Sequence, residues 1–388
     1  MVEVTASGRE CRVCGEARFV VFDTYAALPR ITSDCRPFRS GGELRLCCSC
    51  GAVQKIATAR WLAEIAEIYR EYTPYYQSEG AEQAVFDSHA RRLRPRSEIL
   101  IERLALAVPL REQGAVLDIG CGTGATLRAL SGLLPGYRLY GQDLDRRNEK
   151  RLQAIPNFVE LYTCNLRELT RRFDIATLIH ALEHFPDPLE LLRTVRDRLD
   201  ECGVLLIEVC DVERNPFDLL IADHLMHFSA RTLRRIVENA GFRVATVATD
   251  WVEKELSCVA QPASEVSREP DAREPTDIAA TVSRNLDWLQ RMIAIARQAA
   301  ERYGNIGIFG TSIAGTWLAG SIPGGYGFFV DEDPNRIGRR HLGKPILAPH
   351  QIPENAAVVL ALAPLVARTI RERLHHLPVV FIEPPAFD

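Results

Sequence analysis

Four cysteines near the start of the chain have the spacing of a metal site. They form two CxxC pairs, each followed directly by a glycine: Cys11 with Cys14, and Cys47 with Cys50. The two-residue gap places both thiolates of a pair on one edge of a tetrahedron, and the glycine lets the backbone turn its amides toward the sulfurs. Four thiolates close the coordination shell of zinc and leave no position for water, so the pattern predicts a structural zinc ion.

Two alternatives stay open at these cysteines. The interval between the pairs is longer than in common zinc ribbons, so Cys35 or Cys48 could replace one of the four ligands. The cysteines could also be buried thiols without a metal.

A second group of residues is typical of a nucleotide site. An apolar run leads into a glycine-rich turn and then into the helical segment ATLRALSGLL; the residues of the turn are Asp118, Gly120, Gly122 and Gly124. Glycines let the backbone approach a ligand closely, and the free amides at the start of the helix face the same point. The next apolar run closes with Asp143, followed by Leu144, where an acid of a nucleotide-binding sheet accepts hydrogen bonds from ribose hydroxyls. These residues predict a nucleoside pocket.

A layered sheet has to position these residues. Between residues 115 and 260, short apolar runs alternate with longer amphipathic segments, which is typical of a parallel sheet covered by helices. The apolar runs are AVLDIG, RLYGQD, FVELYT, DIATLIH, VLLIEV and VATVAT. Helices are expected in front of this sheet over residues 60–72 and 89–110.

The last third of the chain repeats the α/β pattern. Residues 261–276 are polar and without periodicity, so they are interpreted as a linker or surface loop. A helical pattern follows and is expected to end at Gly304. Four strand candidates come next: NIGIFG, GFFVDE, AAVVLAL and PVVFIE.

Composition narrows the classes of function. Of the 388 residues, 47% are hydrophobic and 25% are charged, as in an ordinary globular protein of two or three domains. The net charge of -4 gives no electrostatic footprint for a nucleic acid, so a small-molecule substrate is expected. The chain has no apolar run of membrane-spanning length and no basic and apolar leader, so we expect a cytoplasmic protein without a membrane partner.

The motif LDIGCGTG, with Asp143 at the end of the next strand, resembles the class I methyltransferases that depend on S-adenosylmethionine (SAM). The resemblance implies an α/β fold with a Rossmann-like class I core, a small N-terminal zinc module and a second, C-terminal Rossmann-like α/β domain. It also implies that Asn165 and Leu166 lie beside the adenine of SAM, and His180 beside its methionine half. The chain is accordingly divided into residues 1–70, a zinc-binding module with a connecting helix; 71–260, the SAM-binding methyltransferase domain; 261–280, a linker; and 281–388, the C-terminal α/β domain.

The order of these parts is similar to that of zinc-containing C-methyltransferases, which act on nucleotide-linked keto-deoxysugars in biosynthetic pathways. In that family a histidine follows the fourth strand and a Tyr-x-Glu-His motif follows the fifth. By alignment these positions correspond here to His184 and to Asp223 with His224. Ile221 stands in place of the tyrosine of that motif, and Asp223 in place of its glutamate, so the substrate and the methylated atom stay open.

The chemistry implied by the resemblance is proton removal from carbon. Carbon attacks an activated methyl group once a proton next to a carbonyl has been removed. A histidine with a pKa of about 6.5 can remove it near neutral pH, and a carboxylate can orient that histidine. We therefore expect His224 to be the base, Asp223 its orienting partner and His184 the group that stabilises the enolate oxygen. Tyr76 is expected to face the substrate, with Tyr72 and Tyr75 as alternatives.

Other parts of the sequence leave alternatives. His227 is expected to be structural, close to a helix capped by Ser229. The segment IGIFGTSIAGTWLAG, followed by Asp331 and Asp333, either holds the nucleotide part of a substrate or belongs to a lid without a ligand. Two other functions stay open: methyl transfer to oxygen or nitrogen of a small natural-product intermediate, and a SAM-binding scaffold without catalysis. The sequence does not predict the oligomeric state.

Overall fold

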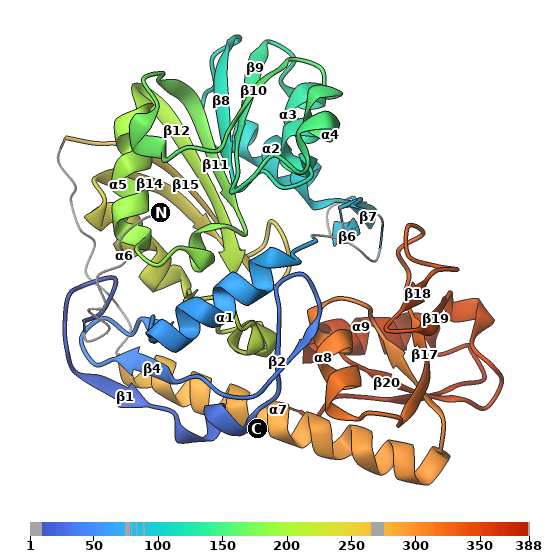
Figure 1. The fold of residues 1–388 in the computed structure, drawn as a ribbon. Coiled ribbons are helices and arrows are strands. Elements are labelled where there is room, and N and C mark those ends of the chain that lie inside the picture. Colours follow the sequence, from blue (N-terminus) through green and yellow to red (C-terminus); the bar gives the residue numbers. More distant parts are fainter. Residues whose placement is uncertain are drawn as a thin grey trace.

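The structure is a computed structural model that describes residues 10–73, 78, 80–82, 84–87, 90–264 and 275–386. Figure 1 shows two sheets flanked by helices, one from the middle of the chain and one from its end, with the N-terminal segment beneath the first sheet. The longest helix, α7 (Pro275–Tyr303), runs along the base of the molecule. We call residues 10–58 the cysteine module.

The middle of the chain forms a seven-stranded sheet with the order β10-β9-β8-β11-β12-β15-β14. Its strands are β8 (Gly114–Ile119), β9 (Tyr137–Gln142), β10 (Phe158–Tyr162), β11 (Phe173–Ile179), β12 (Leu199–Cys210), β14 (Phe242–Ala248) and β15 (Glu255–Pro262). The helices around it are α2 (Arg96–Ala107), α3 (Ala125–Leu133), α4 (Glu149–Gln153), α5 (Pro188–Arg198) and α6 (Ala230–Asn239). The five strands from β10 to β12 are parallel, so their carboxyl ends meet at one edge.

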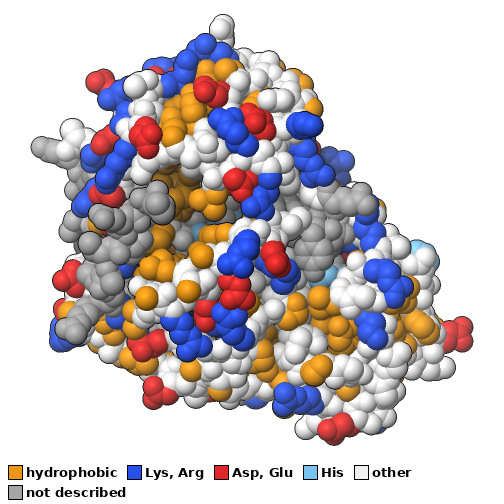
Figure 2. Space-filling model, viewed as in Figure 1, with side chains coloured by type: hydrophobic (Ala, Val, Ile, Leu, Met, Phe, Trp, Pro, Cys, Tyr) orange, Lys and Arg blue, Asp and Glu red, His pale blue; other side chains and the backbone are white. Residues whose placement is uncertain are grey.

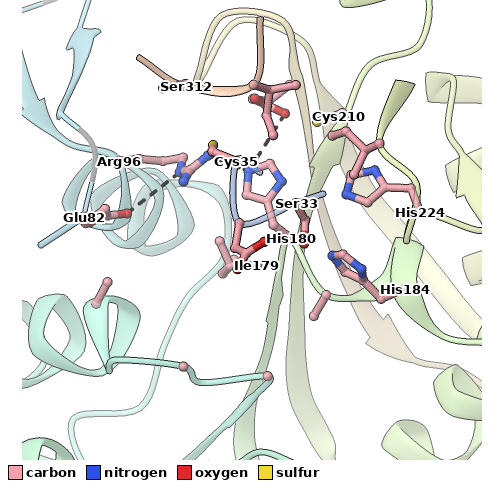
Figure 3. Close-up of a pocket in the computed structure, with 18 of the residues that line it drawn as sticks. Ser33, Cys35, Glu82, Arg96, Ile179, His180, His184, Cys210, His224 and Ser312 are labelled. Carbon is pink, nitrogen blue, oxygen red and sulfur yellow. Dashed lines mark hydrogen bonds and ion pairs between the residues drawn. The ribbon is translucent and has the colours of Figure 1, made fainter. Parts of the chain in front are cut away.

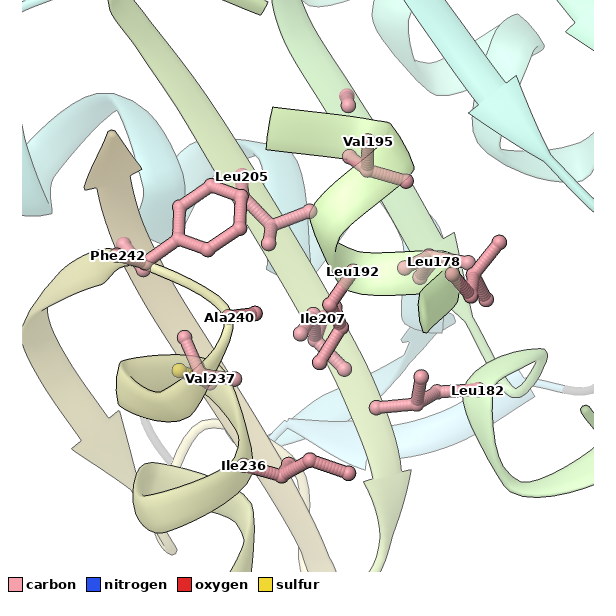
Figure 4. Packing of buried hydrophobic residues seen from close by; sticks show 14 of the residues in the cluster. Leu178, Leu182, Leu192, Val195, Leu205, Ile207, Ile236, Val237, Ala240 and Phe242 are labelled. Atoms are coloured by element: carbon pink, nitrogen blue, oxygen red, sulfur yellow. The ribbon is translucent and has the colours of Figure 1, made fainter. Parts of the chain in front are cut away.

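Apolar packing holds α5 and α6 on one face of this sheet (Figure 4). Leu192 and Val195 of α5 and Ile236 and Val237 of α6 are buried in one cluster with strand residues, among them Leu178, Leu205 and Ile207. Burial of such side chains contributes roughly 1.5–3 kcal/mol each. Helix starts are set locally, because Asp187 caps α5 by accepting from the Glu190 amide and Ser229 caps α6 by accepting from the Thr232 amide.

Two expectations for this part of the chain were wrong. The sheet is mixed rather than parallel, because β15 inserts between β12 and β14 and runs antiparallel to both. The helix expected over residues 89–110 begins at Arg96 instead. The residues before it form β7 (Arg92–Pro95), which pairs with β6 (Ala84–Asp87), because Pro95 adopts an extended backbone and excludes its predecessor from the helix.

The cysteine module forms a small antiparallel sheet with the order β1-β4-β5-β13. Three of its strands are local: β1 (Phe19–Val21), β4 (Leu44–Cys47) and β5 (Val53–Lys55). The fourth, β13 (Met226–His227), comes from the segment between β12 and α6. The pair β2 (Arg30–Ile31) and β3 (Pro37–Phe38) and the 3-10 turn η1 (Asp23–Ala27) complete the module, and α1 (Ala59–Arg70) leads away from it.

The end of the chain forms a six-stranded sheet with the order β18-β19-β17-β16-β20-β21. Its strands are β16 (Ile306–Phe309), β17 (Tyr326–Val330), β18 (Arg340–His341), β19 (Lys344–Leu347), β20 (Ala357–Leu360) and β21 (Val380–Ile382). Its helices are α7, α8 (Ile313–Ser321) and α9 (Pro364–Leu374). Gly304 follows α7 at φ +75°, as expected, but α7 begins at Pro275, inside the segment interpreted as a linker. Proline suits a first helical turn because that turn needs no amide donor.

One hydrophobic core joins the cysteine module to the C-terminal sheet. Its buried members include Tyr25 and Leu44 of the module, Phe217 from the segment after β12, Trp288 of α7 and Trp317 of α8. The division into domains predicted from the sequence stays a prediction, but these segments share their interior.

The surface is mixed in charge on the face shown in Figure 2, where basic and acidic side chains are interspersed. Within the described part of the chain, no helix combines the length and apolar character that crossing a membrane requires.

Candidate active site

The glycine-rich turn lies at the carboxyl end of β8, in the middle of the parallel strands. Gly120, Gly122 and Gly124 all have positive φ, at +73°, +50° and +81°. A Cβ at Gly120 would lie 3.1 Å from Ala181 Cβ, which is a tight contact, and the positive φ also favours glycine there. The turn ends at Gly124, which starts α3.

Asp143 lies at the neighbouring carboxyl end, directly after β9. Its carboxylate accepts hydrogen bonds from the amides of Gly122 and Leu144, both at 2.7 Å. Burial raises the pKa of Asp143, while these two amides oppose the effect. The carboxylate is therefore held at the mouth of the glycine turn.

Asp118 has a different position from the one expected. It is 2% exposed and does not line the cavity; its carboxylate accepts from Thr177 Oγ1 at 2.6 Å. Burial raises the pKa of Asp118 to about 7. Gly124 also lies behind the cavity wall. Both residues shape the turn rather than touch the space in front of it.

A cavity of about 1740 Å³ connects these residues to the rest of the candidate site. The predicted site residues that line it are Gly120, Gly122, Asp143, Leu144, Asn165, Leu166, His180, His184 and His224. Figure 3 shows His184 and His224 side by side, with Ser33 close to them, and His180 nearer to Arg96. Tyr72 lines the cavity, whereas Tyr75 and Tyr76 lie outside the described residues.

The orienting partner of His224 differs from the prediction. His224 Nδ1 donates to Asp218 Oδ1 at 2.8 Å, and Asp218 belongs to the 3-10 turn η5 (Pro216–Leu220). Asp223 instead faces His184, with 3.4 Å between His184 Nδ1 and Asp223 Oδ2. The two residues are neighbours in a loop, where the backbone turns their side chains to different partners.

Asp218 also binds His227, which fits the structural role expected for this histidine. His227 Nδ1 donates to Asp218 Oδ2 at 2.7 Å, and both side chains are buried. Burial lowers the pKa of His227 to about 4. Despite its burial, Asp218 has a pKa well below its usual range because His227 and His224 stabilise the carboxylate.

His184 lies in the 3-10 turn η4 (Leu182–His184) after β11 and is the centre of a second group. Its Nδ1 is 3.1 Å from Tyr69 Oη and 3.2 Å from the carbonyl oxygen of Asp223. Its ring meets the ring of His224 edge to face, with 4.6 Å between the centroids. Burial lowers the pKa of His184, but Asp223 and Glu183 outweigh burial, so the pKa is raised.

His180 is surrounded by charged side chains at the end of β11. It has φ +49°, and its ring lies within 3.9 Å of carboxylate oxygens of Glu183, Glu208 and Glu255. Arg96 Nη1 is 2.6 Å from its Nε2. Burial and Arg96 lower the pKa of His180, but Glu255, Glu183 and Glu208 raise it further, to about 10. His180 therefore lies between one guanidinium and three carboxylates beside the cavity.

The four predicted zinc ligands come together at the edge of the cysteine module. The sulfurs of Cys11 and Cys50 are 3.5 Å apart, as are those of Cys14 and Cys47, and all four lie within 4.8 Å of one another. A tetrahedral zinc ion with Zn–S bonds of about 2.3 Å places sulfurs roughly 3.8 Å apart, so the group fits the metal. The glycines after each pair have positive φ, and the Val13 amide points at Cys11 Sγ. Cys48 is exposed and Cys35 lines the large cavity, so neither joins the cluster.

The C-terminal sheet contributes a second glycine turn to the far end of the cavity. Ser312 starts α8, and Arg336 donates from Nη1 to Ser312 Oγ at 2.8 Å and to Thr311 Oγ1 at 3.0 Å. Ser312, Asp331, Asp333 and Arg336 all line the cavity.

Sequence reasoning missed four residues that line or support the site: Ser33, Tyr69, Asp218 and the buried Lys55, whose Nζ donates to the Ile221 carbonyl. Asp218 lies in the segment NPFDLL, which has no motif that points to a function. The other three residues lie more than 100 positions before His184 and His224. Of these residues, only Tyr69 lies in a segment that the sequence predicts as a helix, in the last turn of α1.

The fold and the glycine turn define a class I methyltransferase domain. Its glycine turn follows the central parallel strand β8, and an acid follows the neighbouring strand β9. Residues 89–247 match the sequence family described as a methyltransferase domain. This part of the chain is therefore a methyltransferase domain of the SAM-dependent class I type.

Two curated methyltransferases are similar to this chain in sequence. The C-methyltransferase NovU of Streptomyces niveus is 26% identical over 262 residues, which are 62% of this chain and 57% of that protein. The mitochondrial ubiquinone biosynthesis O-methyltransferase of Saccharomyces cerevisiae is 28% identical over 148 residues, which are 36% of this chain and 42% of that protein. The chain thus aligns with less than two thirds of the length of either relative. Among solved structures, 1,6-didemethyltoxoflavin-N1-methyltransferase of Burkholderia thailandensis is similar with 20% identity and a TM-score of 0.38, over 55% of this chain and 96% of that one.

Proposed function

We propose that this protein is a SAM-dependent methyltransferase that methylates a carbon atom of a nucleotide-linked keto-deoxysugar or a related keto metabolite in a biosynthetic pathway. The observation that carries the proposal is the pair of histidines, His184 and His224, each held by a carboxylate in the cavity of the glycine turn. The name of one relative, a C-methyltransferase, supports carbon as the acceptor.

SAM fits the residues at the glycine turn. Gly120 and Gly122 leave room for close approach of a ligand, and Asp143 offers a carboxylate at the end of β9 to ribose hydroxyls. Asn165 and Leu166 would border the adenine, and His180 the methionine half. When bound, SAM supplies the methyl group.

His224 is suited to act as a general base. Asp218 accepts a hydrogen bond from Nδ1–H, so the lone pair of the unprotonated ring lies on Nε2. An acceptor whose acidic C–H points at Nε2 would give up its proton there and become an enolate. The second histidine complements this step: Asp223 and Glu183 raise the pKa of His184, which favours the protonated ring that would stabilise the enolate oxygen.

The size of the cavity favours an acceptor with a nucleotide attached. The cavity reaches from Gly120 to Ser312 and Asp331 of the C-terminal sheet and is larger than the roughly 300–1,000 Å³ of a typical small-molecule site. The start of α8 and Arg373, which is paired with Glu332, line the same end of the cavity. These groups would hold the diphosphate. We further propose that Cys11, Cys14, Cys47 and Cys50 bind one structural zinc ion.

Methyl transfer to oxygen is the second candidate. Ile221 places an apolar side chain in the wall of the cavity, where the resembled family has a tyrosine. An acceptor oxygen needs weaker activation than carbon, and one relative is named an O-methyltransferase.

Acceptor chemistry can be tested with nucleotide-linked keto sugars, SAM and deuterated water. Carbon methylation predicts that deuterium exchanges at the acceptor carbon and that the methyl group appears there. His224→Ala is expected to lower both rates by about 10²–10⁴-fold, whereas the exposed His350→Ala serves as the matched control and retains them. Methylation without exchange, or exchange that survives in His224→Ala, would exclude this mechanism.

The donor site is tested separately by calorimetry with S-adenosylhomocysteine, the demethylated form of SAM. Asp143→Asn removes the charge that would bind the ribose, so Kd is expected to rise about tenfold to a hundredfold. Asp197→Asn, an exposed carboxylate on α5, is the control and keeps the affinity. No binding to the wild-type protein would refute the SAM site.

A further inference from the structure

A loop of the cysteine module enters the candidate active site. It connects β2 to β3, and Ser33, Asp34 and Cys35 line the cavity from it. Cys35 has φ +63° and starts the return of the chain toward β3. Figure 3 shows Ser33 and Cys35 among the residues around His180, His184 and His224. A segment that precedes the methyltransferase domain by many residues therefore forms part of its wall.

Ser33 fixes the carboxylate of Asp223 with two hydrogen bonds across 190 residues of sequence. Its amide donates to Asp223 Oδ1 at 2.9 Å, and its hydroxyl donates to Oδ2 at 2.5 Å. Asp223 is fully buried, and Oδ2 is the same oxygen that faces His184 Nδ1. Ser33 thus determines how the carboxylate is presented to His184.

The backbone around Asp223 is also held by the module and by α1. The Ala222 amide donates to the Ile31 carbonyl at 2.7 Å, and Trp61 Nε1 donates to the Ala222 carbonyl at 3.1 Å. The buried Lys55 of β5 binds the carbonyls on both sides, from its amide to Leu225 and from Nζ to Ile221.

The pairing of β5 with β13 extends this attachment beyond the histidine. Val53 pairs with His227 and Gln54 with Met226, in antiparallel register. The whole segment from Ile221 to His227, including His224, is therefore built against residues 31–61.

We propose that Ser33 is a positioning residue of the active site and that the cysteine module is thereby part of the catalytic machinery. Without the serine hydroxyl, the buried carboxylate loses one of its two Ser33 donors, keeps His184 beside Oδ2, and turns toward that ring. The orientation of His184 then changes, and with it the group that faces the acceptor oxygen. This inference rests on the proposed methyl transfer, because it assigns a role within that reaction.

The test uses the full-length protein with labelled histidines and S-adenosylhomocysteine bound. The variants are Ser33→Ala, Ser33→Thr, which restores a hydroxyl, and Ser40→Ala, an exposed serine of the cysteine module after β3 that serves as control. The NMR signal of His184, assigned by its loss in His184→Gln, is followed with pH. Tyr69, Glu183 and His224, which also face His184, are unchanged in all three variants.

In Ser33→Ala the titration midpoint of His184 is expected to rise by about half a pH unit or more. The reason is that Asp223 Oδ2 no longer accepts a hydrogen bond from the serine hydroxyl, so its negative charge stabilises a protonated His184 more strongly. Ser33→Thr returns the midpoint toward the wild-type value, and Ser40→Ala leaves it unchanged. All variants bind S-adenosylhomocysteine with wild-type affinity. With a methyl acceptor, Ser33→Ala lowers kcat about tenfold or more and leaves KM unchanged.

A wild-type His184 titration in Ser33→Ala, or an equal shift in Ser40→Ala, would overturn the inference. Should Ser33→Ala not fold, Ser33→Cys replaces the hydroxyl by a weaker donor of similar shape and is held to the same expectation. If the wild-type protein does not bind S-adenosylhomocysteine, the proposed function fails before any variant is compared. If it binds and His184 is insensitive to Ser33, the proposed function stands and the role of Ser33 is refuted.

Discussion

Asp218 shows how one carboxylate gives two histidines different roles. It accepts from His224 through one oxygen and from His227 through the other. His224 lines the cavity, whereas His227 is buried behind it and pairs in β13. In the proposed mechanism, the ring of His224 would exchange a proton with the acceptor, whereas the ring of His227, held by the same carboxylate, only supports the fold.

His341 in β18 provides a residue whose charge state depends on burial. Its Nε2 accepts from Thr316 Oγ1 at 2.7 Å, and the side chain is fully buried. Burial, and then Arg336, lower the pKa of His341 to about 4. The imidazole is neutral in the folded protein.

The low pKa of His341 predicts a pH dependence of stability. The unfolded chain has the ordinary pKa of about 6.5 and binds the proton first, so stability present above pH 6.5 is lost as pH falls toward 4. Between pH 7 and 4.5 the loss from this residue is about 2–3 kcal/mol in the free energy of unfolding, measured by urea denaturation. His341→Gln should be less sensitive to this change than the wild type, and the exposed His350→Gln equally sensitive. Equal pH sensitivity of His341→Gln and the wild type would contradict the assignment.

At the scale of elements, the sheet of the cysteine module depends on two distant parts of the chain. Its cysteines lie in the turns around β4 and before β1, while its last strand, β13, comes from the segment that carries His224. A metal at the cysteines would fix the turns, and the pairing of β5 with β13 would transmit that order to the segment.

Metal analysis is expected to find about one zinc ion per chain, because four thiolates form a closed tetrahedral site. Cys47→Ser is expected to lose the metal and to lower the thermal midpoint, since metal binding and folding are linked in such modules. Cys48→Ser is the matched control: it lies next to Cys47 but outside the cluster, and it should retain both metal and stability. Loss of zinc in Cys48→Ser, or its retention in Cys47→Ser, would show that the ligands are assigned incorrectly.

At the scale of the whole molecule, the first and last parts of the chain are packed into one interior. Trp317 of α8 donates from Nε1 to the Pro29 carbonyl at 3.0 Å and meets Phe217 edge to face, with 5.8 Å between the centroids. The C-terminal residues fold back on α7, where Trp288 Nε1 donates to the Pro385 carbonyl at 2.6 Å. The C-terminal sheet therefore supports the segments that build the site.

Trp317→Ala is predicted to destabilise the whole protein rather than the C-terminal sheet alone. Removing a buried tryptophan costs about 3–5 kcal/mol, and this side chain is 1% exposed at the junction of three segments. Scanning calorimetry should show one transition at lower temperature. Leu365→Ala, at a position that is 74% exposed, should leave the transition within about 1 °C of the wild type. A second, separate transition in Trp317→Ala would mean that the parts fold independently.

The sequence by itself determined the features that are written in neighbouring residues. The glycine turn, its strand and helix, the two cysteine pairs and the cap of α6 depend on backbone freedom and hydrogen bonds within a few residues, so local sequence patterns predict them. The same holds for the helix end at Gly304. The catalytic, donor and zinc assignments of individual residues stay predictions, although the geometry brings most of those described to one cavity or cluster.

Only the tertiary structure decided which side chains face one another. Asp223 was assigned to its neighbour His224, but a loop sends adjacent side chains in different directions, so Asp218 binds His224 while Asp223 binds Ser33. The antiparallel insertion of β15 and the pairing of β13 with β5 join segments far apart in the chain. Contacts of this kind arise when distant surfaces bury their apolar faces together, and no local periodicity records them.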